Sequence, residues 1–579
     1  MDEPGIRYRI SIPRPATHLV RVAIEIDDAP TSLALRLPAW IPGSYLVREF
    51  ARHVQGFRAT DDAGRSLPWH KTRKDTWLIE TQVGHRVCVE LDVYANELSV
   101  RTSHVDATHA FLNPPNLLPY VEGRTDEPVT VDIVDAPDGW QVHAALSMAG
   151  QPGSYLAHDY DELADSPIHV GPDPSITFQV EGKTHTIATW GHGNVDLPRL
   201  AADVERIVQA EAALFGALPY ERYLFILLLT DGGRGGLEHR TSTALMVPRF
   251  NLRAGTTYER ALRLVAHEFF HTWNVKRIRP AWEGGRIDYA TENYTRLLWA
   301  MEGITDYYSP LSLRRAGLMT PARYLEVLGE HMSELAETPG RQVQSLEEAS
   351  FDTWIKYYRP DEHSVNSSVS YYLKGALASL LLDLEMRRRT AGEHSLDDVM
   401  RLLWVRHGLT DQPVPEAGYR SAVQEVAGGD WDAFFASAIA GRDDLNYGPA
   451  LAAVGLTIEW RADANASPAW LGLRLRTEAG RTRVASVLSN GPAWGTGLSA
   501  GDELLALDGF RIDESSMDSR LRDYRPGDTA MLAAFRRDEL VQVPITLTER
   551  PATRATVGKA RRANVRQRAL YEGWMHAPW

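Results

Sequence analysis

Hydrophobic and polar residues alternate with a period of two along much of the first 175 residues. Clear examples are residues 8–12, 19–26 and 86–93, and breaks rich in Pro, Gly and Asp separate them. Alternation of this kind is typical of strands that bury one face. We therefore predict an N-terminal antiparallel β-domain over residues 1–175.

A helical period begins near Arg199, where apolar residues recur at steps of three and four until Gly216 and Pro219 end the pattern. Residues 223–229 are wholly apolar and predict a buried strand, and residues 237–247 predict another strand after a Gly-rich turn. Helical patterns dominate from residue 258 to about 445. We expect one mostly helical domain over residues 176–455.

Strands return between residues 469 and 547, and this stretch is similar to a PDZ domain of the bacterial protease-associated type. The resemblance implies a PDZ-like β-domain over 460–550, whose groove adds a peptide as a strand. Backbone N–H groups at Leu471, Gly472 and Leu473 would then meet the peptide's terminal carboxylate. Residues 551–579 carry six Lys and Arg against one Glu, and we predict a basic tail that is solvated or docks on an acidic domain.

Composition narrows the classes of function. The chain has 579 residues, 62 Lys and Arg against 76 Asp and Glu, and a formal net charge of −14, which argues against a nucleic-acid binder. Its single cysteine excludes an internal disulfide framework. No apolar run approaches the length of a membrane span, and the acidic N-terminus lacks the features of a signal peptide, so we expect a cytoplasmic protein.

The sharpest chemical signal is the pentad HEFFH at residues 267–271. On a helix, His267 and His271 lie on one face, one turn apart, so both imidazoles can reach one ion. Zinc in a hydrolytic site takes three protein ligands and a water, and Glu268 is placed to take the proton of that water. Two histidines on a helix can also be purely structural, so a third ligand is the test.

A second predicted helix supplies the third ligand. Glu302 and Asp306 are again four residues apart, within the run WAMEGITDYY. One carboxylate can bind the metal while the other accepts the ring N–H of a ligating histidine. A His/His/Glu set followed by this Asp is similar to the pattern of gluzincin metallopeptidases, which implies His267, His271 and Glu302 as ligands and Asp306 as the residue that orients a histidine, His267 in the first place.

Two further motifs resemble those of gluzincin aminopeptidases. GGLEH at 235–239 is similar to their Gly-x-Met-Glu-Asn strand, which implies that Glu238 binds the free α-amino group of the substrate. YYLKGA at 371–376 is similar to their Tyr-x-Lys-Gly-Ala stretch, which implies that Tyr372 donates a hydrogen bond to the transition-state oxyanion. Tyr371 is the neighbouring candidate.

Together with the segment WIPGSYLVREF at 40–50, these motifs identify the chain as similar to the glycyl aminopeptidase family of gluzincin zinc peptidases. The resemblance implies a multidomain α+β protein with a β-domain, a thermolysin-like catalytic domain and a PDZ-like domain. It also implies one zinc ion per chain and release of small N-terminal residues, such as Gly or Ala, from peptides with a free N-terminus. Tyr45 and Arg48 are further candidates for substrate contact, and Lys276 and Arg277 are expected to bind the last carbonyls of the metal-binding helix.

Three alternatives remain open at this stage. An endopeptidase could recruit substrates through the PDZ-like domain, and it would cleave peptides with a blocked N-terminus. A catalytically inactive scaffold could present the PDZ groove alone, although the intact metal motif argues against it. The same zinc frame could also hydrolyse a non-peptide substrate.

Overall fold

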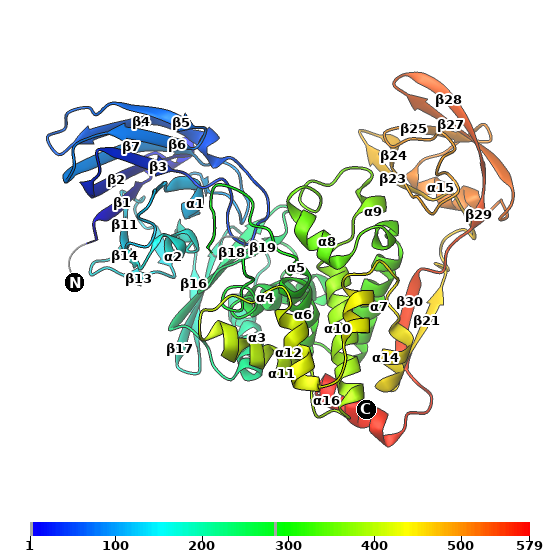
Figure 1. Ribbon diagram of the computed structural model, residues 1–579. Helices are drawn as coiled ribbons and strands as arrows, with labels where there is room; N and C mark the ends of the chain where they lie inside the picture. Colours follow the sequence, from blue (N-terminus) through cyan, green and yellow to red (C-terminus); the bar gives the residue numbers. More distant parts are fainter. Residues whose placement is uncertain (1–3, 283–285) are drawn as a thin grey trace. The chain divides into compact units, whose positions relative to one another are not determined.

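The computed structural model describes residues 4–282 and 286–579, and the chain forms two compact units (Figure 1). The first unit consists of Met1–Tyr294 with Trp404–Pro413, and the second of Thr295–Leu403 with Val414–Trp579. None of the described helices is long and apolar enough to cross a membrane.

The first unit begins with the predicted β-domain. A seven-stranded sheet has the order β13-β14-β11-β1-β2-β7-β4. Alternate residues of β2 are buried, as the sequence pattern predicted, and include Val20, Val22 and Ile24. All neighbours in this sheet are antiparallel except β1 and β11, which run parallel. Its strands are β1 (Ile6–Ser11), β2 (Leu19–Ala29), β4 (Val54–Asp61), β7 (His85–Tyr94), β11 (Val129–Val134), β13 (Ser147–Met148) and β14 (Ser154–Ala157).

Two four-stranded sheets and two short helices complete this domain. The first sheet contains β3 (Ser32–Arg36), β5 (Trp69–Arg73), β6 (Thr76–Glu80) and β10 (Tyr120–Val121). The second contains β8 (His104–Val105), β9 (Ala110–Leu112), β12 (Gln141–Ala144) and β15 (Ile168–Gly171). The helices are α1 (Pro114–Leu117) and α2 (Tyr160–Ala164).

A mixed five-stranded sheet follows in the first unit, in the order β16-β17-β18-β20-β19. The apolar strand β18 lies at its centre, parallel to β17 and β20. The region predicted as one strand over 237–247 is instead the antiparallel hairpin β19–β20. The elements are β16 (Ser175–Val180), β17 (Lys183–Trp190), α3 (Leu197–Phe215), β18 (Arg222–Thr230), β19 (Gly235–Glu238), β20 (Ser242–Pro248) and α4 (Gly255–Phe270).

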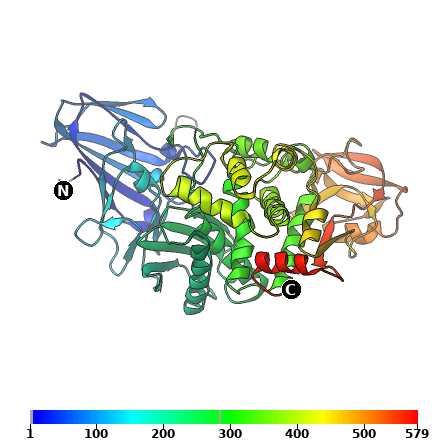
Figure 2. The ribbon, with the colours of Figure 1, turned by 60° about the horizontal axis from the view of Figure 1, so that its bottom comes forward.

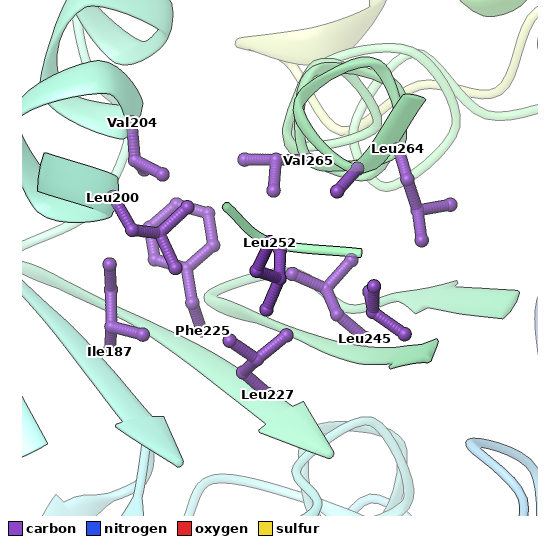
Figure 3. A pocket seen from close by; sticks show the side chains of 11 residues that line it. Ile187, Leu200, Val204, Phe225, Leu227, Leu245, Leu252, Leu264 and Val265 are labelled. Carbon is purple, nitrogen blue, oxygen red and sulfur yellow. The ribbon is translucent and has the colours of Figure 1, made fainter. Parts of the chain in front are cut away.

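Helices α3 and α4 cover one face of this sheet. Figure 3 shows their apolar side chains, such as Val204 and Val265, meeting Phe225 and Leu227 from the strands. The cavity left between them has a volume of only about 10 Å³, no more than one water needs. This region is therefore a packed core that fixes α4, the helix of the HEFFH pentad, on the sheet.

Helices dominate the first part of the second unit. They are α5 (Leu298–Met301), α6 (Gly303–Arg315), α7 (Pro321–Ala336), α8 (Leu346–Phe351), α9 (Ser364–Ser367), α10 (Leu373–Arg389), α11 (Leu396–Leu403), α12 (Gly418–Ala427), α13 (Asp432–Ala438) and α14 (Tyr447–Ala453). Helices α6 and α10 approach each other so closely that a Cβ on Gly303 would lie 2.6 Å from the Cα of Gly375. This contact explains a glycine in both the EGITD and the YYLKGA motifs.

The PDZ-like domain of the second unit has the strand order β23-β24-β25-β27-β28, and β26 pairs with β25. Strand β23 therefore lies at a sheet edge. The elements are β22 (Ala469–Trp470), β23 (Leu473–Glu478), β24 (Arg481–Val487), β25 (Glu503–Leu507), β26 (Phe510–Arg511), α15 (Glu514–Leu521), β27 (Thr529–Arg536), β28 (Glu539–Thr546) and β29 (Thr548–Glu549).

The segment predicted as a basic tail contains regular structure. Strand β30 (Arg554–Lys559) pairs with β21 (Leu456–Arg461), and α16 (Val565–Met575) packs on α6 (Figure 2, red). Tyr571 and Trp574 of α16 are fully buried, and the Trp574 indole donates a 2.9 Å hydrogen bond to the Tyr307 hydroxyl. Two of the basic residues, Arg566 and Arg568, thus lie exposed on a helix whose opposite face belongs to the core of the second unit.

Candidate active site

Helix α4 places His267 and His271 side by side at its C-terminal end. The Nε2 atoms of the two rings are 3.1 Å apart. The Nδ1 atom of His271 lies 2.7 Å from the carbonyl oxygen of Asn274, which is a hydrogen-bond acceptor. Nδ1 must therefore carry the proton, which leaves the Nε2 lone pair for a metal.

Strand β19 packs on this helix and brings the carboxylate of Glu238 close to that of Glu268, which α4 itself carries. A Cβ on Gly236 would lie 2.0 Å from Oε1 of Glu268, so the absence of a side chain at Gly236 leaves room for the Glu268 side chain. Glu238, two residues further on, shares the same face of the strand because side chains alternate. One ligand atom each of Glu238, Glu268 and His271 lies within 4.8 Å of the other two.

The loop that carries the WIPGSY motif packs on Glu238. A Cβ on Gly43 would lie 2.5 Å from Oε1 of Glu238, and the φ of +91° at Gly43 is a second reason for glycine there. Glu238 is 4% exposed, and its Oε1 accepts no hydrogen bond from the described residues. A buried carboxylate oxygen with no donor is suited to receive one from a substrate ammonium group.

A cavity of about 470 Å³ adjoins Glu238. Among the described residues, its lining includes Trp40, Tyr45, Lys276 and Tyr289. Tyr45, predicted as a substrate contact, is thus buried in the wall of this cavity. Arg48 is not among the lining residues, and it donates hydrogen bonds within its own loop, to the Ser44 hydroxyl and the Leu46 carbonyl.

A charged network that the sequence does not predict lies beside Glu238. Asp165 lies 2.8 Å from the Lys276 ammonium group and 3.0 Å from Nδ1 of His239. Burial alone would raise the pKa of Asp165, but these two partners hold it well below its usual range. Lys276 therefore does not close the end of α4 as predicted, and Arg277 donates at 2.7 Å to the carbonyl of Thr272, which lies two residues beyond the last residue of α4. No local signal links Asp165 to residues more than 70 positions away.

In the second unit, Glu302 lies between α5 and α6 and is 2% exposed. The backbone N–H of Asp306 donates to its carbonyl, so both residues continue one helical path. With the two imidazoles of α4, the Glu302 carboxylate makes up the predicted ligand set of His267, His271 and Glu302. Two imidazoles and a carboxylate are a donor set that fits zinc.

Two adjacent tyrosines at the start of α10 have different surroundings. Tyr371 is fully buried, and its hydroxyl lies 2.9 Å from the Thr353 hydroxyl. The hydroxyl of Tyr372 lies 3.2 Å from that of Tyr358. Burial, together with the nearby Glu302 carboxylate, raises the pKa of Tyr372 well above its usual value. The Tyr372 phenol therefore stays protonated and can donate a hydrogen bond. The same holds for Tyr371, and Tyr372 is the better candidate of the two because it is partly exposed whereas Tyr371 is fully buried.

Two residues of the predicted PDZ carboxylate loop, Leu471 and Gly472, lie between β22 and β23, and the third, Leu473, begins β23. Gly472 has a φ of +74°, and a Cβ there would lie 2.5 Å from the Cα of Gly491. The carbonyl oxygens of Leu471 and Gly472 accept backbone hydrogen bonds from Ala493 and Leu488. These contacts fix the backbone of the loop immediately before the edge strand β23, which begins at Leu473.

Comparison with known proteins gives matches along most of the chain. Residues 7–172 match the Peptidase M61 N-terminal domain, residues 260–378 match M61 glycyl aminopeptidase, and residues 469–547 match a PDZ domain. A search of the curated proteins found no match.

Two solved structures extend this result. An aminopeptidase N family protein from Idiomarina loihiensis is 32% identical, with a TM-score of 0.93, over 98% of this chain and 100% of its own. An M1 zinc metallopeptidase from Deinococcus radiodurans shares the fold at 14% identity, with a TM-score of 0.50, over 77% of this chain and 95% of its own. The chain therefore belongs to the M61 glycyl aminopeptidase family and is a metallo-aminopeptidase, a hydrolase of peptide bonds.

Proposed function

We propose that the protein is a zinc-dependent aminopeptidase that releases the N-terminal residue of peptides. The observation that carries the proposal is the convergence of Glu238 and Glu268 on the histidine pair of α4 within the first unit. A histidine pair with one adjacent carboxylate can bind a metal and activate water, and the second carboxylate can bind an ammonium group.

His267, His271 and Glu302 would hold one zinc ion. Zinc, when bound, supplies a Lewis acid that polarises the substrate carbonyl and makes water acidic enough to lose its proton near neutral pH. Glu268 accepts that proton and passes it to the leaving amine. Asp306 fixes the ring of a ligating histidine, His267 in the first place.

Glu238 and Tyr372 would act on the substrate directly. Glu238 pairs with the α-ammonium group and so sets the cut one residue from the N-terminus. Tyr372 donates a hydrogen bond to the carbonyl oxygen as negative charge develops on it. Tyr45, in the wall of the adjoining cavity, contacts the N-terminal side chain.

The proposed preference is for small N-terminal residues such as Gly or Ala, and it rests on the name of the family. We also keep the division into domains at 1–175, 176–455, 460–550 and 551–579 as part of the proposal. The PDZ-like domain would take a peptide C-terminus along β23, because an edge strand offers unpaired backbone groups. Peptides with free and amidated C-termini, compared by fluorescence polarisation, test this arm.

Aminoacyl p-nitroanilides and their N-acetylated counterparts test the main proposal. We expect the zinc-loaded protein to cleave the free amines, a chelator to abolish cleavage, and N-acetylation to lower kcat/KM by at least about 10²-fold. Equal cleavage of blocked substrates would favour the endopeptidase. Faster release of Arg or Trp than of Gly and Ala would contradict the preference for small residues but not the aminopeptidase activity.

A further inference from the structure

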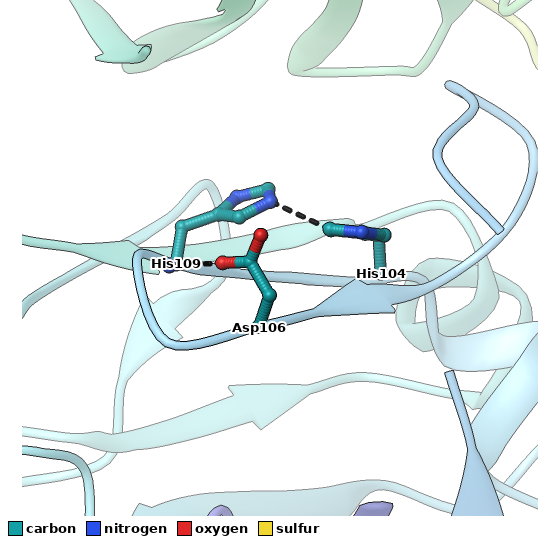
Figure 4. Close-up of side chains that lie close together, drawn as sticks. All are labelled: His104, Asp106 and His109. Carbon is teal, nitrogen blue, oxygen red and sulfur yellow. Dashed lines mark hydrogen bonds between the residues drawn. The ribbon is translucent and has the colours of Figure 1, made fainter. Parts of the chain in front are cut away.

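A second group of metal-binding side chains lies in the β-domain, on the hairpin of β8 and β9 (Figure 4). It consists of His104, Asp106 and His109, and one ligand atom of each lies within 4.8 Å of the other two. Nδ1 of His104 and Nε2 of His109 are 2.8 Å apart. None of these residues belongs to the site proposed for catalysis.

The turn of this hairpin orients the three side chains. The backbone N–H of Asp106 donates to the His109 carbonyl and closes the turn. Oδ1 of Asp106 accepts hydrogen bonds from the N–H groups of Thr108 and His109 and from the Thr108 hydroxyl. Oδ2 accepts none of these bonds, and Figure 4 shows it turned toward the His109 ring. One oxygen therefore builds the turn, and the other remains as a ligand.

The distances match the geometry of a metal site. Zn–N bonds of about 2.0–2.1 Å at a tetrahedral angle place two ligating nitrogens roughly 3.3 Å apart. The His104–His109 pair is at 2.8 Å and the α4 pair at 3.1 Å, so either would open by about half an ångström or less. A hydrogen bond between two neutral rings also gives such a distance, and the adjacent carboxylate is what distinguishes a metal site from it.

Two buried histidines in and beside this group have ring nitrogens without a hydrogen-bond partner among the described residues. His109 and His169 are at most 1% exposed. Nδ1 of His109 and both nitrogens of His169 have no hydrogen-bond partner among the described residues. The His109 ring stacks on Trp190 at a centroid distance of 3.8 Å, which fixes its plane. The atoms that face one another in the group are instead Nδ1 of His104 and Nε2 of His109, and the buried, stacked His109 ring presents its Nε2 in a fixed direction.

We propose that His104, Asp106 and His109 bind a divalent first-row transition ion, with zinc as the preferred metal. Two imidazoles and one carboxylate suit zinc better than calcium or magnesium, which select oxygen ligands. Water takes the fourth position. The ion joins the two strands of the β8–β9 hairpin and so stabilises the β-domain rather than taking part in peptide hydrolysis.

Zinc content per chain tests the proposal on the full-length protein, dialysed against buffer with micromolar zinc. The wild type is expected to hold two equivalents and H104Q one, whereas the matched control H85Q, at the exposed start of β7, keeps two. H271Q, which removes a proposed catalytic ligand, should retain one equivalent, and H104Q/H271Q none. H104Q should keep its aminopeptidase activity.

The H271Q protein separates this proposal from the proposed function, because its β-domain group is intact. Cobalt added to H271Q should give the intense visible absorption of a tetrahedral site, and zinc should raise its melting temperature. If H104Q does not fold, D106N replaces it, since Asn keeps the Oδ1 acceptor of the turn; its zinc affinity should fall about 10- to 100-fold. An H271Q protein that holds no metal would overturn the proposal, whatever the activity of the wild type.

Discussion

Gly236→Ala is the substitution whose effect the structure defines best. A Cβ at this position would lie 2.0, 2.3 and 2.5 Å from Oε1, Cδ and Cγ of Glu268. Three atoms of one side chain are too close, so rotating the carboxylate tip alone does not relieve the clash. Because carbon and oxygen atoms in contact need roughly 3.2–3.5 Å, the Glu268 carboxylate must move by about 1 Å.

The strand itself should accept alanine. Gly236 does not have a positive φ, and its Cβ would meet Glu268 rather than backbone. A misplacement of about 1 Å in a catalytic group costs roughly 10²-fold in rate, or about 3 kcal/mol. We therefore expect kcat on alanine p-nitroanilide to fall about 10²-fold, while the melting temperature and the metal content stay close to those of the wild type.

Gly235→Ala is the matched control on the same strand. Its Cβ would meet only Arg101 Nη1 at 3.6 Å and Val100 Cγ2 at 3.9 Å, which are ordinary contacts. Both variants add one methyl group to neighbouring residues, so the difference between them isolates the position of Glu268. If kcat of the Gly236→Ala enzyme equals that of the Gly235→Ala enzyme, Glu268 is not the base that activates water.

Three further predictions concern other parts of the chain. Tyr372→Phe should lower kcat about 10²- to 10³-fold with metal content unchanged. Tyr371→Phe loses the contact with Thr353 and should cost about 1 kcal/mol of unfolding free energy. Equal losses of kcat in the two variants would refute Tyr372 as the oxyanion donor. Glu238→Gln should lower kcat/KM for free-amine substrates about 10- to 150-fold, and an unchanged kcat/KM would remove its role. Burial lowers the pKa of His185 to about 4, so between pH 4 and 6.5 the unfolded chain binds more protons than the folded one, and the free energy of unfolding falls by up to about 3 kcal/mol as the pH drops through this window. Urea unfolding at pH 7 and at pH 4.5 should show that His185→Gln loses less stability than the wild type. An equal loss of stability in the two proteins would contradict this role of His185.

Local patterns were sufficient for the elements that carry the chemistry. The apolar run that became β18, the spacing of His267 and His271, and the period of α4 depend on residues close together in the sequence. The role of the glycines around the site could be predicted only in part. The sequence indicates a turn at Gly235 and Gly236, but it does not show that the backbone there leaves room for Glu268.

Long-range contacts account for what the sequence did not predict. The turn between β19 and β20 has no Gly or Pro, and Asp165, distant in sequence, holds it through the His239 ring and the N–H of Arg240. The predicted single strand therefore became a hairpin. For the same reason Lys276 pairs with Asp165 and not with the end of α4, because a largely buried carboxylate attracts a cation more strongly than a helix terminus does.

The role of Glu268 in activating water is tested most directly by Glu268→Gln, measured for zinc content and single-turnover rate on the same preparation. Gln keeps the shape of the side chain and removes the basic oxygen, so the variant should hold as much zinc as the wild type and lose turnover by several orders of magnitude. A variant that keeps both its zinc and its rate would contradict the account.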